Sequence, residues 1–359
     1  MNVFNKKSET FLFDYLNNTA PTGFETPGQK IWLEYLKPYV DEWHLDNYGT
    51  AYGVINPGKD YRVVIEAHAD EISWYVNYIS DNGFIQVIRN GGSDHIIAPS
   101  MRVNIHTKKG IVKGVFGWPA IHTRRGKDEN LSPTVENIFV DVGAKDKAEV
   151  IEMGIHVGCV ITFVDELFEL NNKWYCGRAL DNRMGGFCIA EVARMLKEKK
   201  KKLPYSLYIV NAVQEEIGLR GAEMVANTIK PHVAIVTDVT HDTGTPLVNN
   251  KIHGDIKCGA GPTLTYAPSV HNKLLNHVID VAEKSKISFQ RSAASRTTGT
   301  DTDAFAYSNG GVPSVLISLP LRYMHTTVEM ACKEDINGVI GLIYETLLSI
   351  KAGQSFKYF

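Results

Sequence analysis

Two adjacent carboxylates, Glu215 and Glu216, are the first residues in the chain that suggest chemistry. They follow an apolar run at residues 207–213, and Gly218 comes just after them. A short apolar run bounded in this way predicts a buried strand. Carboxylates at the end of a buried strand are costly unless a cation meets them. The pair alone fits a solvated strand end equally well, so its meaning depends on the rest of the chain.

Other residues of metal-binding type follow further apolar runs. His68 and Asp70 follow the run at residues 62–67, and Glu215 and Glu216 follow the run at 207–213. Asp238 follows the run at 233–237, and His325 comes shortly after the run at 313–318. A further acid, Asp181, precedes an expected helix at residue 185. In open α/β sheets the carboxyl ends of the strands form the ligand crevice. Two histidines with several carboxylates at such an edge fit a mixed nitrogen and oxygen site for zinc, cobalt or manganese.

Each candidate also has a structural interpretation when it is taken alone. His68 could be a satisfied core histidine, and Asp181 could cap the helix that follows it. Asp238 could form a turn at a strand end, and His325 could be a surface residue. All of these interpretations would have to hold together for the site to vanish, so we favour the metal site. In an extended segment residues i and i+2 point to the same side, and Asp70 is therefore expected to hold His68 in its ligating tautomer.

The elements expected around these residues belong to an α/β fold. Residues 1–71 and 171–359 alternate apolar strands with amphipathic helices, which predicts a mixed sheet covered by helices on both faces. Residues 72–170 instead hold many short strand-like runs, and Asp81-Asn82-Gly83 marks a hairpin between two of them. The sequence therefore predicts one catalytic α/β domain, interrupted by an inserted β domain that is barrel-like or sandwich-like.

Composition and charge restrict the classes of function. The chain has 359 residues, 44% of them hydrophobic, which is ample for a large core and favours roughly two domains. The formal net charge of −2 gives no field that would attract nucleic acid or an anionic membrane. The longest uncharged stretch, residues 304–321, is broken by glycines and prolines, so no membrane span is expected there.

Cysteine usage and the N-terminal sequence bear on the compartment. The five cysteines show no CxxC spacing, which argues against a disulfide framework or a structural zinc finger. The first fifteen residues lack the apolar core and cleavage site of a signal peptide. Both observations predict a cytoplasmic protein.

Five ordered segments give the chain a family resemblance. They are residues 67–72 (AHADEI), 179–183 (ALDNR), 213–222 (VQEEIGLRGA), 237–238 (TD) and 320–326 (PLRYMHT). They resemble the signature of the dinuclear metallo-aminopeptidases of the glutamyl and deblocking type, which include the tetrahedral (TET-type) peptidases and some members labelled endoglucanase or cellulase. The resemblance runs over nearly the whole chain and includes residues 139–144 and 154–155 of the insertion.

This resemblance implies a phosphorylase/hydrolase-like fold of the zinc exopeptidase type. It implies two divalent metal ions per subunit, zinc first, with cobalt or manganese as alternatives. The roles that it implies are as follows: Asp181 bridges the metals, His68 and Asp238 complete one metal site, Glu216 and His325 complete the other, Asp70 orients His68, and Glu215 is the general base. The insertion is implied to drive self-association, commonly into dodecamers.

Elementary chemistry explains why the two adjacent acids should have different roles. Two dications a few ångströms apart need a shared anion, which a bridging carboxylate supplies. Glu215 must stay off the metals to move a proton, whereas Glu216 must bind one. Neighbours in a strand point opposite ways, so we expect a local bend after Gln214, which Gly218 would allow.

Candidate substrate contacts rest on weaker signals. The segment 298–303, which contains Asp301, is a substrate-pocket loop by the resemblance and a plain polar turn otherwise. Arg322 and Tyr323 lie next to His325 in the chain, so they are expected either to contact substrate or to pack. His122, in the insertion, is a weaker candidate still.

We therefore predict a cytoplasmic, metal-dependent aminopeptidase that removes N-terminal residues from peptides. A glycosidase could use paired carboxylates, but it rarely needs two histidines at metal spacing, and loss of activity with a chelator separates the two. A scaffold with structural metals fits less well, since a closed zinc site favours cysteines, and none lies in these segments. A related di-metal carboxypeptidase or deacylase is closer, and N-acetylated or C-terminally amidated peptides discriminate it.

Overall fold

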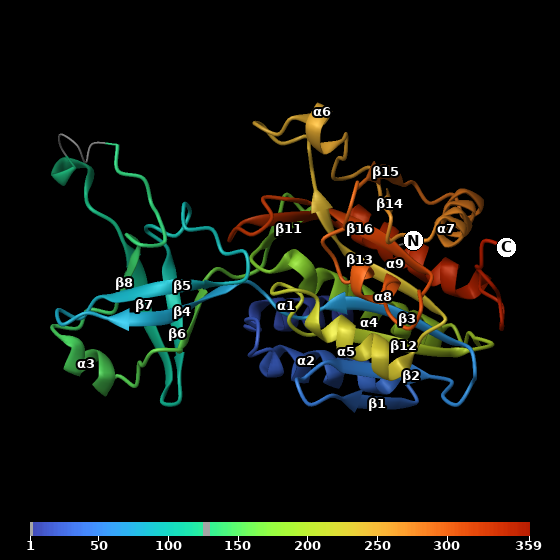
Figure 1. Ribbon diagram of the computed structural model, residues 1–359, viewed down its shortest axis with the longest axis horizontal. Helices are drawn as coiled ribbons and strands as arrows, with labels where there is room; N and C mark the ends of the chain where they lie inside the picture. Colours follow the sequence, from blue (N-terminus) through green and yellow to red (C-terminus); the bar gives the residue numbers. More distant parts are fainter. Residues whose placement is uncertain (1–2, 125–129) are drawn as a thin grey trace. The chain divides into compact units, whose positions relative to one another are not determined.

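The chain is divided between two units, and each is described by itself. The computed structural model describes residues 3–124 and 130–359. The smaller unit consists of Ile72–Glu166 and the short segment His325–Thr327, and the larger unit consists of the rest of the described chain. Figure 1 colours the chain in sequence order, so Ile72–Glu166 runs there from light blue to green.

A mixed sheet forms the centre of the larger unit. Its main strands lie in the order β1 (Glu42–Leu45), β2 (Ala51–Ile55), β12 (Ser206–Ala212), β3 (Arg62–His68), β13 (Val233–His241), β16 (Ser314–Arg322), β17 (Glu329–Cys332), β11 (Trp174–Gly177) and β10 (Phe168–Leu170). Two further strands, β14 (Thr263–Tyr266) and β15 (Gln290–Ala293), pair beside β16. The four central strands β12, β3, β13 and β16 run parallel, whereas their outer neighbours run antiparallel.

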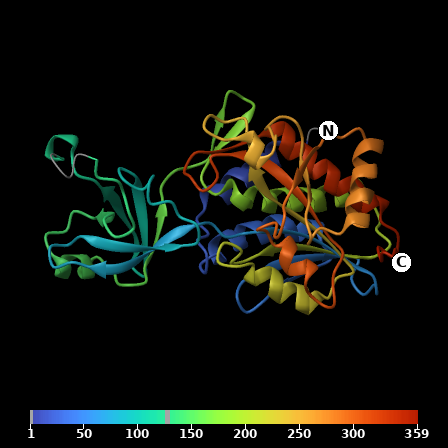
Figure 2. The same cartoon turned by 45° about the horizontal axis from the view of Figure 1, so that its top comes forward.

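The central strands are nearly continuous apolar runs because helices cover both of their faces. One face is covered by α1 (Lys6–Asn17), α2 (Thr26–Leu36), α4 (Leu180–Glu198) and α9 (Lys333–Ser349), with α7 (Asn272–Lys284) beside α9. The other face is covered by α5 (Arg220–Ile229) and α8 (Thr302–Ala306). Figure 2 shows the sheet between these two layers of helices. This arrangement confirms the predicted α/β class with a mixed sheet covered by helices.

The smaller unit is a closed six-stranded barrel. Its strands lie in the order β4 (Ser73–Ile79), β5 (Ile85–Asn90), β8 (Phe139–Asp141), β7 (Gly110–Gly117), β6 (Arg102–Thr107) and β9 (Val160–Phe163). The Asp81-Asn82-Gly83 turn joins β4 to β5 as an antiparallel hairpin, as its sequence predicts. Trp74 and Phe116 pack edge to face in the barrel core. The unit also contains a short helix, α3 (Lys147–Glu152), and a 3₁₀ turn at Ile121–Thr123.

Several boundaries differ from those expected from the sequence. The insertion was expected to extend to residue 170, but the smaller unit's main segment ends at Glu166, because β10 pairs with β11 in the large sheet. The strand expected at residues 233–237 continues to His241, since β13 pairs with β16 along its length. The short α6 (Asn250–His253) and the 3₁₀ turn at Lys37–Tyr39 have no periodic signal. Within residues 3–124 and 130–359, no helix combines the length and the apolar character that a membrane crossing requires.

Gly221, in the first turn of α5, lies against the end of the preceding strand segment. A Cβ atom there would come within 2.5 Å of the backbone nitrogen and oxygen of Val213, and its own amide donates to that oxygen at 2.9 Å. Backbone atoms cannot move aside as a flexible side chain can, so we expect Gly221→Ala to lower the free energy of unfolding by about 1–3 kcal/mol. Urea denaturation followed by circular dichroism measures the change.

Gly341, inside α9, is the matched control for this prediction. A Cβ atom there would meet only the Cδ1 atom of Ile287, at an ordinary 3.7 Å. Gly341→Ala should therefore leave the protein as stable as before, or stabilise it by about 0.5–1 kcal/mol through the backbone entropy of the unfolded chain. Equal stability of the two variants would contradict the packing that we describe at Gly221.

Candidate metal centre

The parallel strands deliver the candidate ligands to one edge of the sheet. Residues in register on neighbouring strands, such as Ala212 on β12 and His68 on β3, lie side by side. Asp238 lies near the carboxyl end of β13, and His325 follows β16. The carboxyl ends of parallel strands share an edge, so side chains far apart in the sequence meet there.

Two overlapping groups of ligand-type atoms lie at this edge. Within each group the atoms all lie within 4.8 Å of one another: the first holds His68, Asp181 and Asp238, and the second holds Asp181, Glu216 and His325. Asp181 is common to both groups. The structure thus brings together the five residues expected as ligands, and their donors are imidazole nitrogens and carboxylate oxygens, which suit zinc, cobalt or manganese.

His68 is held with its two ring nitrogens facing different partners. Its Nδ1 lies 3.2 Å from the backbone carbonyl oxygen of Asp70 and 3.3 Å from Oδ1 of the same residue, and its Nε2 lies 3.2 Å from Oδ1 of Asp181. The imidazole is almost completely buried, and so is the Asp70 carboxylate. A carboxylate at one ring nitrogen fixes the ring and leaves the other nitrogen for a metal. The geometry matches the orienting role expected for Asp70, which stays a prediction.

Asp181 reaches the site because the start of α4 is irregular. Its φ of −75° and ψ of 112° are not helical, so its side chain leaves the helix instead of capping it. The next residue, Asn182, donates from Nδ2 to the Thr237 carbonyl oxygen at 2.8 Å on β13. The Asp181 amide donates to Oε2 of Glu329 at 3.1 Å. These bonds anchor the segment beside the sheet edge.

The two adjacent acids lie on a tight turn, which we call the acidic turn (residues 214–220). Strand β12 ends at Ala212, and Gln214 has a φ of +58°, in the left-handed region. The Glu215 carbonyl oxygen accepts from the amides of Gly218 and Leu219 at 2.8 and 3.0 Å. The bend expected after Gln214 therefore lies at Gln214 itself. Glu216 belongs to one of the two ligand groups, whereas Glu215 belongs to neither.

The acids of this site are buried close together, so their negative charges are poorly solvated and repel one another. Burial raises the pKa of Glu215 to about 11, with further contributions from nearby acids. The pKa of Asp238 is also raised well above its usual range, chiefly by burial. Burial would lower the pKa of His68, but the surrounding carboxylates raise it well above the ordinary value. A divalent cation among these groups relieves their mutual repulsion, so the charge balance of the site fits bound metal.

A second pair of buried acids, Glu66 and Asp301, lies close to His68. Asp301 was expected only as part of a substrate-pocket loop, and Glu66 was missed from the sequence. The two side chains are 0% and 1% exposed, and no N–H or hydroxyl group of the described residues donates to their carboxylate oxygens. The two carboxyl groups are close enough to share a hydrogen bond with each other when one of them is protonated. Burial raises the pKa of Glu66 to about 8 and that of Asp301 well above its usual range. Glu66 lies two residues before His68 on β3, and period-2 alternation could have placed both on one face.

The residues expected to contact substrate occupy less direct positions. Asp301 is almost completely buried, close to Glu66 and His68, which does not support a direct contact with a peptide. The Nε atom of Arg322 donates to Oδ2 of Asp242 at 2.7 Å, and its guanidinium lies 4.6 Å from the centre of the Trp174 ring. Tyr323 is 45% exposed, and His122 lies on an exposed 3₁₀ turn of the barrel. The substrate roles of these residues stay predictions.

Comparison with known proteins gives consistent similarities. The sequence model of the family described as M42 glutamyl aminopeptidase matches residues 49–342. The lysyl aminopeptidase of Pyrococcus furiosus (strain ATCC 43587 / DSM 3638 / JCM 8422 / Vc1) is 33% identical over 338 residues, which cover 94% of this chain and 95% of that protein.

Solved structures extend the similarity to the fold. The TET aminopeptidase from the marine sediment archaeon Thaumarchaeota archaeon SCGC AB-539-E09 has a TM-score of 0.92 and 29% identity, covering 96% of this chain and 98% of its own. The Pyrococcus horikoshii TET1 peptidase, which can assemble into a tetrahedron or a large octahedral shell, has a TM-score of 0.84 and 26% identity, covering 96% and 100%.

Proposed function

This chain belongs to the M42 glutamyl aminopeptidase family, and we propose that it removes N-terminal residues from peptides with two metal ions and Glu215 as the general base. The observation that carries the proposal is the pair of ligand groups that share Asp181. One carboxylate common to two donor sets is the arrangement that a bridged pair of dications requires.

We assign the ligands according to these groups. His68 and Asp238 hold one metal ion, Glu216 and His325 hold the other, and Asp181 bridges both. Asp70 keeps the His68 ring in the orientation that presents Nε2 to the first metal, which its position beside Nδ1 supports. Zinc is the metal we propose, and cobalt and manganese suit the same donors.

Glu215 moves the proton in this proposal. Divalent metals, when bound, polarise the scissile carbonyl and make a water molecule more acidic. Glu215 accepts the proton of the attacking water and donates it to the leaving amine. Its carboxylate lies 3.8 Å from Nε2 of His68, which is close enough to the ligands to reach a water among them. Its absence from both ligand groups supports a role that is separate from metal binding.

The proposal extends to the cellular setting and the assembly of the protein. We propose a cytoplasmic enzyme that acts on peptides and associates with itself, with the inserted barrel as the contact and a dodecamer as the expected form. Support for self-association comes from the similarity to the TET1 peptidase, which assembles into closed shells.

Metal removal tests the proposed chemistry. We expect a chelator to reduce the release of N-terminal residues by at least about 10²-fold, because general acid–base catalysis alone leaves the carbonyl unpolarised. Zinc or cobalt added to the stripped protein should restore the rate. Free amino acids released from a peptide with an unblocked N-terminus are measured by mass spectrometry.

The peptide ends give this experiment its controls. An N-acetylated copy of the peptide should resist cleavage, and a C-terminally amidated copy should be cleaved as fast as the unmodified one. Release of residues from the C-terminus, or removal of the acetyl group, would identify a carboxypeptidase or deacylase instead. Cleavage of a glycoside that survives the chelator would identify a glycosidase.

A further inference from the structure

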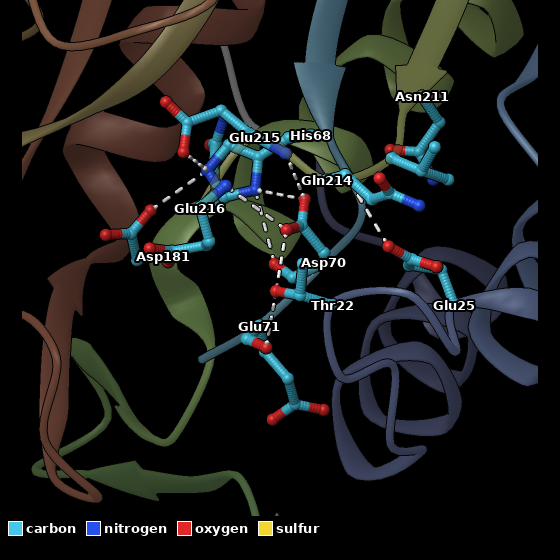
Figure 3. Close-up of polar contacts among 12 residues, drawn as sticks. Thr22, Glu25, His68, Asp70, Glu71, Asp181, Asn211, Gln214, Glu215 and Glu216 are labelled. Atoms are coloured by element: carbon cyan, nitrogen blue, oxygen red, sulfur yellow. Dashed lines mark hydrogen bonds and ion pairs between the residues drawn. The ribbon is translucent and has the colours of Figure 1, made fainter. Parts of the chain in front are cut away.

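Three successive backbone amides at the start of the acidic turn each donate to a buried carboxylate. The Glu215 and Glu216 amides donate to Oδ1 and Oδ2 of Asp70 at 3.0 and 3.2 Å. The Gln214 amide donates to Oε1 of Glu25 at 3.2 Å. Figure 3 shows Asp70 between His68 and the acidic turn, and Glu25 reaching Gln214 from the other side. Two acids thus fix the backbone of the residues that carry the proposed chemistry.

One segment near the N-terminus, residues 21–25, takes part in both sets of hydrogen bonds to the acidic turn: it contains Glu25, and it contacts Asp70. We call this segment the N-terminal turn. Thr22 donates from Oγ1 to Oδ2 of Asp70 at 2.9 Å. Glu25, from the same turn, also accepts from the Gly23 amide at 2.8 Å. The Thr22 amide donates to the carbonyl oxygen of Glu71, which holds the turn against the end of the His68 segment. The N-terminal turn therefore connects the end of β3 with the acidic turn after β12.

Glu25 is buried at a cost that its local hydrogen bond does not explain. The side chain is 2% exposed, and burial, followed by the charge of Asp70, raises the pKa of its carboxyl to about 7. The bond to Gly23 would stabilise the N-terminal turn even with the carboxylate in solvent. The bond to Gln214 spans 189 residues of sequence and requires the buried position. Glu25 is therefore buried in the position from which it can accept the hydrogen bond of the Gln214 amide.

Gln214 is the residue at which the backbone most needs a restraint. Its left-handed φ of +58° is unfavourable for a residue with a side chain and persists only when its surroundings hold it. On its carbonyl side Gln214 accepts from the Arg220 amide at 3.2 Å, within the acidic turn itself. On its amide side the holding group is Glu25. Relaxation of Gln214 would rotate the peptide that leads directly into Glu215.

We propose that Glu25 is a positioning residue for Glu215 and Glu216, acting through the Gln214 amide. This inference rests on the proposed function for its catalytic consequence. Glu25 touches neither ligand group, so its effect is on where the acidic turn places its two carboxylates. A displacement of about 1 Å at a reacting group can reduce a rate by about 10²-fold.

Two variants of Glu25 separate the hydrogen bond from the charge. Glu25→Met keeps the length of the side chain and removes the acceptor. At saturating metal we expect its kcat to fall by about 10- to 10²-fold with KM near that of the wild type, and its affinity for the metal at Glu216 to weaken as well. Glu25→Gln keeps an acceptor oxygen for the Gln214 amide and should recover most of kcat. Steady-state kinetics and metal analysis on the same preparations measure these changes.

Gln29 offers a matched control in the same neighbourhood. Its Nε2 donates to the Asn211 carbonyl oxygen at 2.7 Å, and Asn211 donates from Nδ2 to Oε1 of Gln29 at 2.8 Å. Gln29→Met thus breaks a buried polar contact between α2 and β12 without touching Gln214. It should lower Tm and leave kcat unchanged. Equal losses of kcat in Gln29→Met and Glu25→Met, or none in Glu25→Met, would show that Glu25 is only structural.

Hydrogen exchange gives a readout that does not depend on activity or on any variant that fails to fold. In the metal-free wild type, the amides of Gln214, Glu215 and Glu216 should exchange slowly, as hydrogen-bonded groups do. Exchange of the Gln214 amide at the rate of an open loop would overturn the proposal. If the wild type proves to have no peptidase activity, the proposed function fails, while this exchange measurement still decides whether Glu25 restrains the turn.

Discussion

Glu215→Gln should lower kcat by about 10³-fold or more while the metal content stays near that of the wild type, because the amide cannot accept the proton of water. The substitution preserves the shape of the side chain. The bonds that hold the acidic turn come from the Glu215 backbone, so they persist in the variant. Metal analysis by mass spectrometry and peptide turnover on the same sample measure the two properties together.

Glu216→Gln is the matched comparison for this variant. Glu216 shares a ligand group with Asp181 and His325, and a neutral amide oxygen is a weaker ligand for a dication than a carboxylate. We therefore expect Glu216→Gln to lose one metal ion as well as activity. If Glu215→Gln also loses a metal ion, the division of roles between the two acids is wrong.

Asp181→Ala should cost both metal ions, since Asp181 is the one side chain common to the two ligand groups of the described residues. Removal of the bridging anion also leaves two dications to repel each other at short distance. We expect metal affinity to fall by at least about 10²-fold at both sites, a larger loss than the 10- to 100-fold typical of outer-shell partners. Isothermal titration of the stripped protein with zinc measures it.

Asp335→Ala is the control that separates the general effect of removing a buried aspartate from the loss of a metal ligand. Asp335 is 0% exposed and accepts from the amides of Gly259 and Gly261, but it belongs to neither ligand group. This variant should lose stability and keep its metal. Retention of one full-strength metal site in Asp181→Ala would argue against a bridge.

The strands that carry the candidate ligands were predictable because their local pattern and their environment agree. β3, β12 and β13 are short apolar runs, and parallel strands with both faces buried have that composition. Once these runs are recognised, the rule that ligands gather at the carboxyl ends of parallel strands brings His68 and Asp238 together. The hairpin at Asp81-Asn82-Gly83 was predictable from turn chemistry alone.

Other parts of the fold and the site leave no local signal. Strands β10 and β17 are three and four residues long and exist because β11 pairs with both. The bond from Gln214 to Glu25 joins residues 189 apart, and no periodicity in either segment indicates it. The non-helical start of α4, which frees Asp181, depends on contacts such as that of Asn182 with Thr237. Such features follow from tertiary packing, which overrides local propensity.

The most direct test of a two-metal aminopeptidase is a cobalt titration of the metal-stripped protein, with release of the N-terminal residue from an unblocked peptide as the readout. The proposal predicts no turnover without metal and a rate that rises until two ions are bound per subunit. Full turnover by the stripped protein, or with a single ion per subunit, would contradict it.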